Sequence, residues 1–293
     1  MPNMQLTAVL FMVLSMVAYQ ISASFAKQLF EVLDPLTVVT LRLSFAAILI
    51  VLMFRSWTII KRLPYLQWKN ILFYSASVCL MNVLFYISLG KLPQGIAVGL
   101  EFLGPLTLAL LSIKHKSDYI WVCLAILGVT LMIPWQDTSA AHFSYLGAAL
   151  AISAGVFWAL YIYFGQRVVR QNIGMHGLSI AIVLSAMVML PISIVHNPTA
   201  LFQTQYWGQA LIIALLATAI PYTLDFLALK QLTKLSYGTL SSLSPALAAL
   251  AGWVLLKEQI TVLQSIALLC IMIASVGVTI RAAKKPTATL SPE

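Results

Sequence analysis

The sequence predicts an all-α integral membrane protein with ten transmembrane helices in two inverted five-helix repeats. Three observations lead to this fold class. First, the 293 residues are 61 % hydrophobic and only 9 % charged, whereas soluble domains carry about a quarter charged residues. Second, apolar stretches of about 20 residues, the length of one bilayer crossing, follow one another along the whole chain. Third, the fourth apolar segment of each half contains a proline in a similar sequence.

Polar and turn-forming residues divide the chain into ten apolar segments. Asp34-Pro35, Lys91-Leu92-Pro93 and Asn197-Pro198 are typical interruptions. Continuous apolar runs indicate helices, because the strands of a membrane barrel would alternate apolar with polar residues. The expected spans are 4–25, 36–54, 70–89, 95–113, 119–135, 145–164, 178–196, 207–227, 238–256 and 260–280.

The basic residues fall mainly on alternate connections. Most of the 17 lysines and arginines would lie on one side of the membrane, whereas only Lys27, Lys91 and Lys257 would lie on the other. Short basic loops stay in the cytoplasm, so both termini are expected there. This bias also accounts for the net charge of +9 without a nucleic-acid partner.

An internal repeat appears when residues 92–110 are laid on residues 232–250, an offset of 140. Pro105 then falls on Pro245, and several leucines and an alanine also match. These segments are the fourth expected helix of each half. Because each half has an odd number of helices, the repeats 1–140 and 141–293 would have opposite orientations, an architecture that recurs in secondary transporters.

Enzyme and cofactor signatures are missing from the sequence. The four histidines have no metal-ligand spacing, and the chain lacks both a Gly-x-Ser-x-Gly elbow and a phosphate-binding loop. The cysteines lie within apolar runs and read as buried small residues. We therefore expect no metal, no cofactor and no ATP drive. A channel, an intramembrane enzyme and a structural or receptor-like membrane protein are the weaker alternatives.

Ionisable residues at membrane depth need a partner or a function, because they are costly to insert. Glu101 and Arg42 should lie at similar depths in the fourth and second helices. Two interpretations remain open. The two residues could form a structural ion pair, or Glu101 could exchange protons or bind a substrate amine, because burial disfavours a charged carboxylate.

Other polar residues share helix faces and are candidates for substrate binding or ion coupling. A polar stripe in a membrane helix should face protein or water and not lipid. Each candidate also has a structural reading, as a packing residue, an interhelical hydrogen bond or an interfacial group. The candidates are Gln20, Ser24, Asn82, Tyr86, Trp158, Tyr161, Tyr222, Asp225, Ser241 and Ser244.

Three prolines are candidate hinges. Pro105, Pro221 and Pro245 each remove a backbone donor at membrane depth. Neighbouring helices could simply cover the resulting kinks. Alternatively, the kinks provide the bends that alternating access requires.

Several of these segments resemble the drug/metabolite transporter superfamily, and within it the EamA-type threonine and homoserine exporters of the bacterial inner membrane. The similarity is most specific in residues 95–105, 219–229 and 244–249, with Lys257-Glu258 downstream. It implies an exporter of small amino acids coupled to protons, with broader metabolite or drug efflux as the alternative. Two positions depart from the family pattern: Ser244 replaces a frequent acid before the proline, and Asp225 replaces a common glutamate. No oligomeric state follows from the resemblance.

Overall fold

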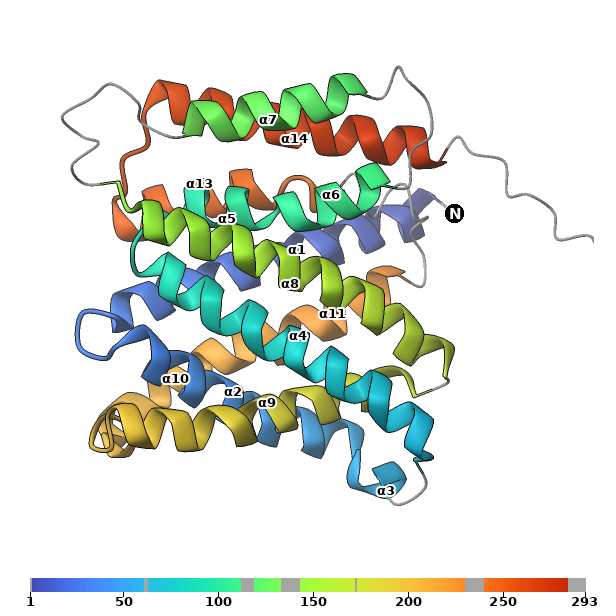
Figure 1. The fold of residues 1–293 in the computed structure, drawn as a ribbon, viewed down its shortest axis with the longest axis vertical. Coiled ribbons are helices and arrows are strands. Elements are labelled where there is room, and N and C mark those ends of the chain that lie inside the picture. Colours follow the sequence, from blue (N-terminus) through green and yellow to red (C-terminus); the bar gives the residue numbers. More distant parts are fainter. Residues whose placement is uncertain are drawn as a thin grey trace, which may run out of the picture.

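The computed structural model describes residues 2–60, 63–111, 119–132, 143–171, 173–229 and 240–283, and these residues form helices joined by short connections. Figure 1 shows the helices lying roughly parallel, with α7 and α14 as a pair at one end and α2, α9 and α10 at the other. Within the described residues, six helices are long and apolar enough to cross a membrane.

The first half of the chain folds into helices close to the predicted spans. They are α1 (Pro2–Leu29), α2 (Pro35–Phe54), α4 (Tyr65–Leu89), α5 (Gln94–Glu101), α6 (Leu103–Leu111) and α7 (Tyr119–Met132), with the short extra helix α3 (Trp57–Ile60) before α4. Asp34 caps α2, because its carboxylate accepts the backbone N–H of Thr37 at 3.0 Å. Residues 112–113 and 133–135 of the predicted spans lie outside the described residues.

The second half of the chain is also helical. They are α8 (Tyr145–Arg170), α9 (Gly174–His196), α10 (Trp207–Ala214), a π-helical turn η5 (Leu215–Ala219), α11 (Ile220–Leu229), α13 (Ser244–Leu256) and α14 (Val262–Ala283). Two 3-10 turns, η3 (Ala200–Phe202) and η4 (Thr204–Tyr206), connect α9 to α10. α8 continues to Arg170, beyond the expected end at 164, and residues 238–239 of the ninth predicted span lie outside the described part.

Two of the three candidate hinge prolines, Pro105 and Pro245, lie just after helix breaks and not inside continuous helices. The helix breaks at Phe102, and Pro105 lies in the first turn of α6. In the second half the break falls at Ser242 and Leu243, and Pro245 lies in the first turn of α13. A proline is tolerated there because the first-turn N–H groups have no intrahelical acceptor. Pro221 instead follows the π-helical turn, a common site of helix bending.

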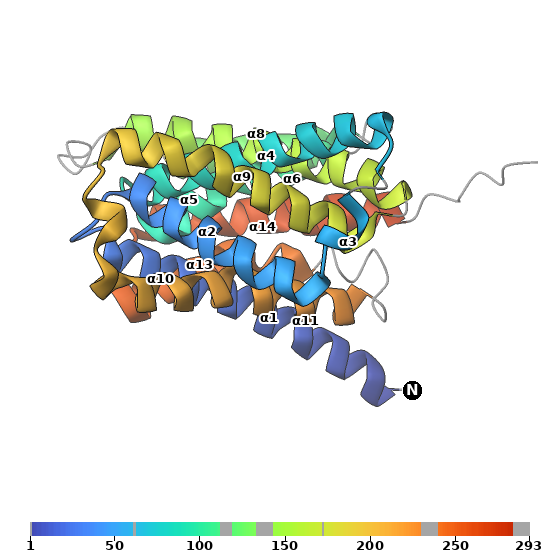
Figure 2. The same cartoon turned by 90° about the horizontal axis from the view of Figure 1, so that it is seen from below.

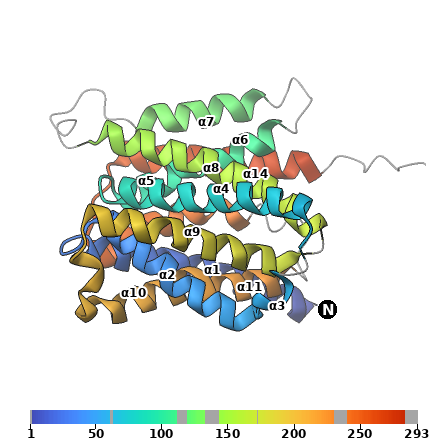
Figure 3. The ribbon, with the colours of Figure 1, turned by 60° about the horizontal axis from the view of Figure 1, so that its bottom comes forward.

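The helices pack in pairs that are distant in sequence. α4 packs against α8, α2 against α9, α1 against α11, α5 against α13 and α7 against α14. Figure 2 shows α2 and α9 toward one side with α1 and α11 next to each other, and Figure 3 shows α4 beside α8. On α1, the side chains of Leu6, Leu10 and Leu14 are exposed, as expected for a helix face that contacts lipid.

Candidate functional site

A cavity of about 200 Å³ lies between the two halves of the chain, bordered by α1, α4, α5, α8 and α11 and by the break before α13. Seven residues singled out from the sequence line it: Gln20, Glu101, Trp158, Tyr161, Pro221, Ser241 and Ser244. The structure therefore brings together candidates that are spread over more than 200 residues of sequence.

Glu101 is the last residue of α5, immediately before the break at Phe102. Its position is set by small residues on α8, because α5 and α6 approach this helix at Gly155. A Cβ atom added at Gly155 would lie 2.5 Å from the carbonyl oxygen of Glu101. Glycine thus permits the close helix approach, and the approach places a carboxyl group, 8 % exposed, on the cavity wall.

Aromatic side chains form the α8 side of the cavity. Trp158 packs edge-on against Phe102, with ring centroids 5.8 Å apart. Tyr161 stacks on Tyr74 of α4 at 5.1 Å. Both aromatics that were predicted for the cavity therefore border it while packing against a neighbouring helix.

Sequence reasoning missed six of the lining residues: Met12, Ser15, Met16, Tyr19, Met81 and Val98. The methionines and the valine look like ordinary packing residues in an apolar chain, so their composition carries no signal. Their spacing carries a weak one, because Met12, Met16 and Gln20 follow each other every fourth residue along one face of α1. This face continues the polar stripe that was recognised at Gln20 and Ser24.

Arg42 lies in a buried cluster formed by α2 and α4. Its guanidinium donates a hydrogen bond to Oδ1 of Asn82 at 2.6 Å, and its Cζ atom lies 5.3 Å from the centre of the Tyr86 ring. Arg42 also interacts with Tyr19, which lines the cavity. Asn82 and Tyr86 are thus placed beside the arginine, and the pairing of Arg42 with Glu101 stays a prediction.

Three other candidates differ from the expected arrangement or cannot be placed. Ser24 donates a hydrogen bond to Gln94 at 2.7 Å, one turn beyond the cavity residue Gln20. Tyr222 and Asp225 belong to α11, but their side chains lie outside the described part of the structure. Among the described residues, no cluster of histidine, cysteine and carboxylate side chains could hold a metal ion.

Comparison with known proteins identifies the fold and the family. The EamA-like transporter family matches residues 6–133 and again residues 145–280. The chain belongs to the EamA-like transporter family. A solved crystal structure shares the fold, with a TM-score of 0.61 at 15 % sequence identity. The match covers 96 % of this chain and 100 % of the chain in that structure.

Two curated proteins are similar to this chain over nearly the full length. The threonine/homoserine exporter RhtA of Salmonella typhimurium strain SL1344 is 39 % identical over 279 residues, 95 % of this chain and 93 % of the exporter. RhtA of Escherichia coli K12 is 38 % identical over 278 residues, 94 % of this chain and 92 % of the exporter. These relatives confirm that the chain is a multi-pass membrane exporter and not an enzyme.

Proposed function

We propose that this protein exports small amino acids of the threonine and homoserine type across the bacterial inner membrane by proton-coupled alternating access. Both termini lie in the cytoplasm, as the distribution of basic residues indicates. The observation that carries the proposal is Glu101, a carboxyl group on the wall of a small cavity between the two halves of the chain. The RhtA relatives support the substrate class.

The size of the cavity favours small substrates. Pockets for drug-sized ligands span about 300–1,000 Å³, and this cavity holds about 200 Å³. Glu101 provides a partner for an amine, while Gln20 and the hydroxyl groups of Ser241 and Ser244 provide polar contacts for a carboxylate. The cavity therefore offers complementary groups for both ends of a zwitterion.

Broader metabolite or drug efflux is the second candidate, and one observation favours it. Met12, Met16 and Met81 line the same cavity, and flexible methionine side chains adapt to ligands of different shape. The limited volume of the cavity weighs against large substrates.

The proposed mechanism depends on ten membrane spans in two inverted repeats, residues 1–140 and 141–293. If the halves correspond through the offset of 140, α8 repeats α1, α9 repeats α2, and α13 repeats α6. The packing of α4 on α8 then has its counterpart in that of α11 on α1, and the packing of α4 on α9 in that of α10 on α2. The breaks at Phe102 and Ser242 are also related by the offset of 140.

The proton step assigned to Glu101 follows from its position. Burial disfavours the charged form of a carboxyl group, and a bound ammonium group favours it. Substrate and proton would therefore compete for Glu101: the substrate amine displaces the proton on the cytoplasmic side, and a proton returns on the outside when the amino acid leaves.

Export from cells tests the proposal directly. Cells loaded with labelled threonine or homoserine should release the label faster when they produce this protein than when they lack it, and unlabelled small amino acids should compete. Equal release from both cells would contradict the amino-acid assignment. Release of large hydrophobic cations instead would support the broader efflux candidate.

A further inference from the structure

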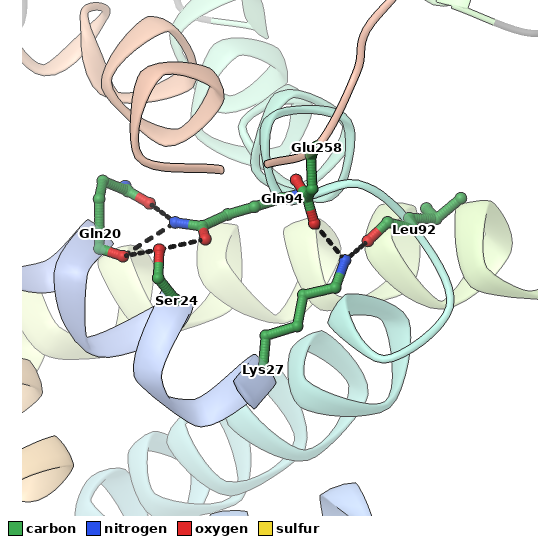
Figure 4. A network of polar contacts seen from close by, with 6 residues as sticks. All are labelled: Gln20, Ser24, Lys27, Leu92, Gln94 and Glu258. Atoms are coloured by element: carbon green, nitrogen blue, oxygen red, sulfur yellow. Dashed lines mark hydrogen bonds and ion pairs between the residues drawn. The ribbon is translucent and has the colours of Figure 1, made fainter. Parts of the chain in front are cut away.

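A polar network at one end of the molecule joins α1, α5 and the connection after α13 (Figure 4). The side chain of Gln94, fully buried, donates from Nε2 to the carbonyl oxygen of Gln20 at 2.9 Å and accepts from Ser24 at 2.7 Å. These bonds tie the beginning of α5 to the C-terminal part of α1. The network lies on the side of Lys91 and Lys257, which is the predicted extracellular side.

Glu258 connects α13 to the same point. Its Oε2 accepts the backbone N–H of Gln94 at 2.7 Å, and its Oε1 lies 2.6 Å from Nζ of Lys27. Lys27 also donates to the carbonyl oxygen of Leu92. The carboxylate thus satisfies a free N–H group at the start of α5, where negative charge is favourable, and holds α1 through the lysine.

The helices α5 and α13 also touch directly at this end. A Cβ atom added at Gly95 would lie 2.7 Å from the Cβ atom of Ala249. Gly252 leaves room for the Glu258 carboxylate to lie over α13. The two short helices therefore meet at their outer ends, while each is interrupted at its inner end, at Phe102 and at Ser242 and Leu243.

One face of α1 links the network to the cavity. Met12, Met16 and Gln20 line the cavity, and Gln20, Ser24 and Lys27 continue the same face into the network. Gln20 belongs to both. The network therefore covers the cavity on the predicted extracellular side, and two of the helices that it joins, α5 and α13, each end at a break suited to act as a hinge.

From this arrangement we infer that Gln20, Ser24, Lys27, Gln94 and Glu258 form the extracellular gate of the cavity. The inference rests on the proposed function and orientation. The gate is closed in this structure, and it opens when α5 and α13 separate from each other and from α1, breaking the contacts of Glu258 with Lys27 and Gln94. Opening exposes the cavity to the outside and lets the substrate leave.

Cysteine labelling tests the gate without measuring transport. In a background in which Cys79, Cys123 and Cys270 are replaced by alanine, Met81→Cys places one thiol on the cavity wall. A membrane-impermeant maleimide is added outside right-side-out vesicles. Met81→Cys should react at least about tenfold more slowly than the exposed Glu31→Cys. Equal rates with the network intact would overturn the inference.

Breaking the network should open the gate. With Met81→Cys as reporter, Lys27→Met and Glu258→Gln should each raise the outside labelling rate about tenfold, equivalent to a shift of about 1.4 kcal/mol toward the open state. Lys91→Met and Glu31→Gln are matched controls, because both residues are exposed on the same side, and they should leave the rate unchanged. Unchanged rates in both network variants would also overturn the inference.

A second reporter separates opening from unfolding. Ala274 of α14 is fully buried, so Ala274→Cys should stay unlabelled in every folded variant. If Ala274→Cys is labelled in a network variant, that variant is unfolded and is set aside. The gate is then judged from the labelling rates of Met81→Cys and Glu31→Cys with the network intact. Fast labelling of Glu31→Cys also verifies the orientation. Since labelling requires no transport, a failed gate leaves the export assignment standing, and failed export leaves the labelling result interpretable.

Discussion

The backbone of Glu101 packs so closely against Gly155 that a single added methyl group at residue 155 would lie 2.5 Å from the Glu101 carbonyl oxygen. Gly104 meets the backbone of Gly155 even more closely. The position of the cavity carboxyl group therefore depends on a glycine of α8, in the other half of the chain.

Gly155→Ala should lower both stability and export. Overpacking typically costs about 1–3 kcal/mol, and separation of α5 from α8 would displace Glu101. Thermal unfolding in detergent and export assays measure the two effects. Gly208→Ala is the matched control, because a Cβ atom there meets nothing within 4 Å. It should be neutral or stabilise α10 by up to about 1 kcal/mol. Similar behaviour of the two variants would contradict the close-packing argument.

Glu101→Gln should strongly reduce export while the protein still accumulates, because the amide keeps the shape of the side chain but can neither titrate nor bind an ammonium group as an ion pair. Export and protein level are measured in the same cells, with the exposed Glu31→Gln as the control. Export at the level of the unmodified protein would rule out the coupling role. Loss of the protein would instead favour a structural ion pair with Arg42, whose disruption costs about 3–5 kcal/mol.

The methionine wall should limit substrate size. Met16→Ala or Met81→Ala enlarges the cavity, so larger amino acids should compete better with threonine, by about tenfold relative to the unmodified protein, because one methylene group can change discrimination by that order. Met187→Ala is the control, since Met187 is exposed on α9. An unchanged order of competitors in both cavity variants would show that these methionines do not set selectivity.

Orientation can be tested independently of transport. The concentration of lysine and arginine on one side predicts that both termini lie in the cytoplasm. When fused to the C-terminus, a reporter that works only in the cytoplasm should therefore be active, and a reporter that works only outside the cytoplasm should be inactive. A C-terminus on the outside would contradict the predicted orientation. Termini on opposite sides would contradict the ten-span proposal, because an even number of crossings places both ends on one side.

The sequence predicted the helices well because each span had to be apolar and about 20 residues long, which is a local requirement. Glu101, Trp158 and Ser244 were recognised because polar or aromatic groups at membrane depth stand out against leucine. Met81 and Val98 were not, since an apolar residue that lines a cavity looks like one that faces lipid.

The ion pair of Lys27 with Glu258 was also missed, for a different reason. Charged residues at helix ends are usually solvated, and only the fold brings the end of α1 to the end of α13. The helix breaks were displaced from the prolines because proline fits the first turn of a new helix better than the middle of an old one.

Transport in reconstituted vesicles tests most directly whether a proton gradient drives amino-acid export. An imposed pH gradient should drive labelled threonine against its own concentration gradient, toward the side from which protons enter. Transport should saturate at high substrate concentration, and a protonophore should abolish the uphill component. Uphill movement that persists without any proton gradient would contradict proton coupling, and purely downhill, non-saturating flux would show that the protein is a channel.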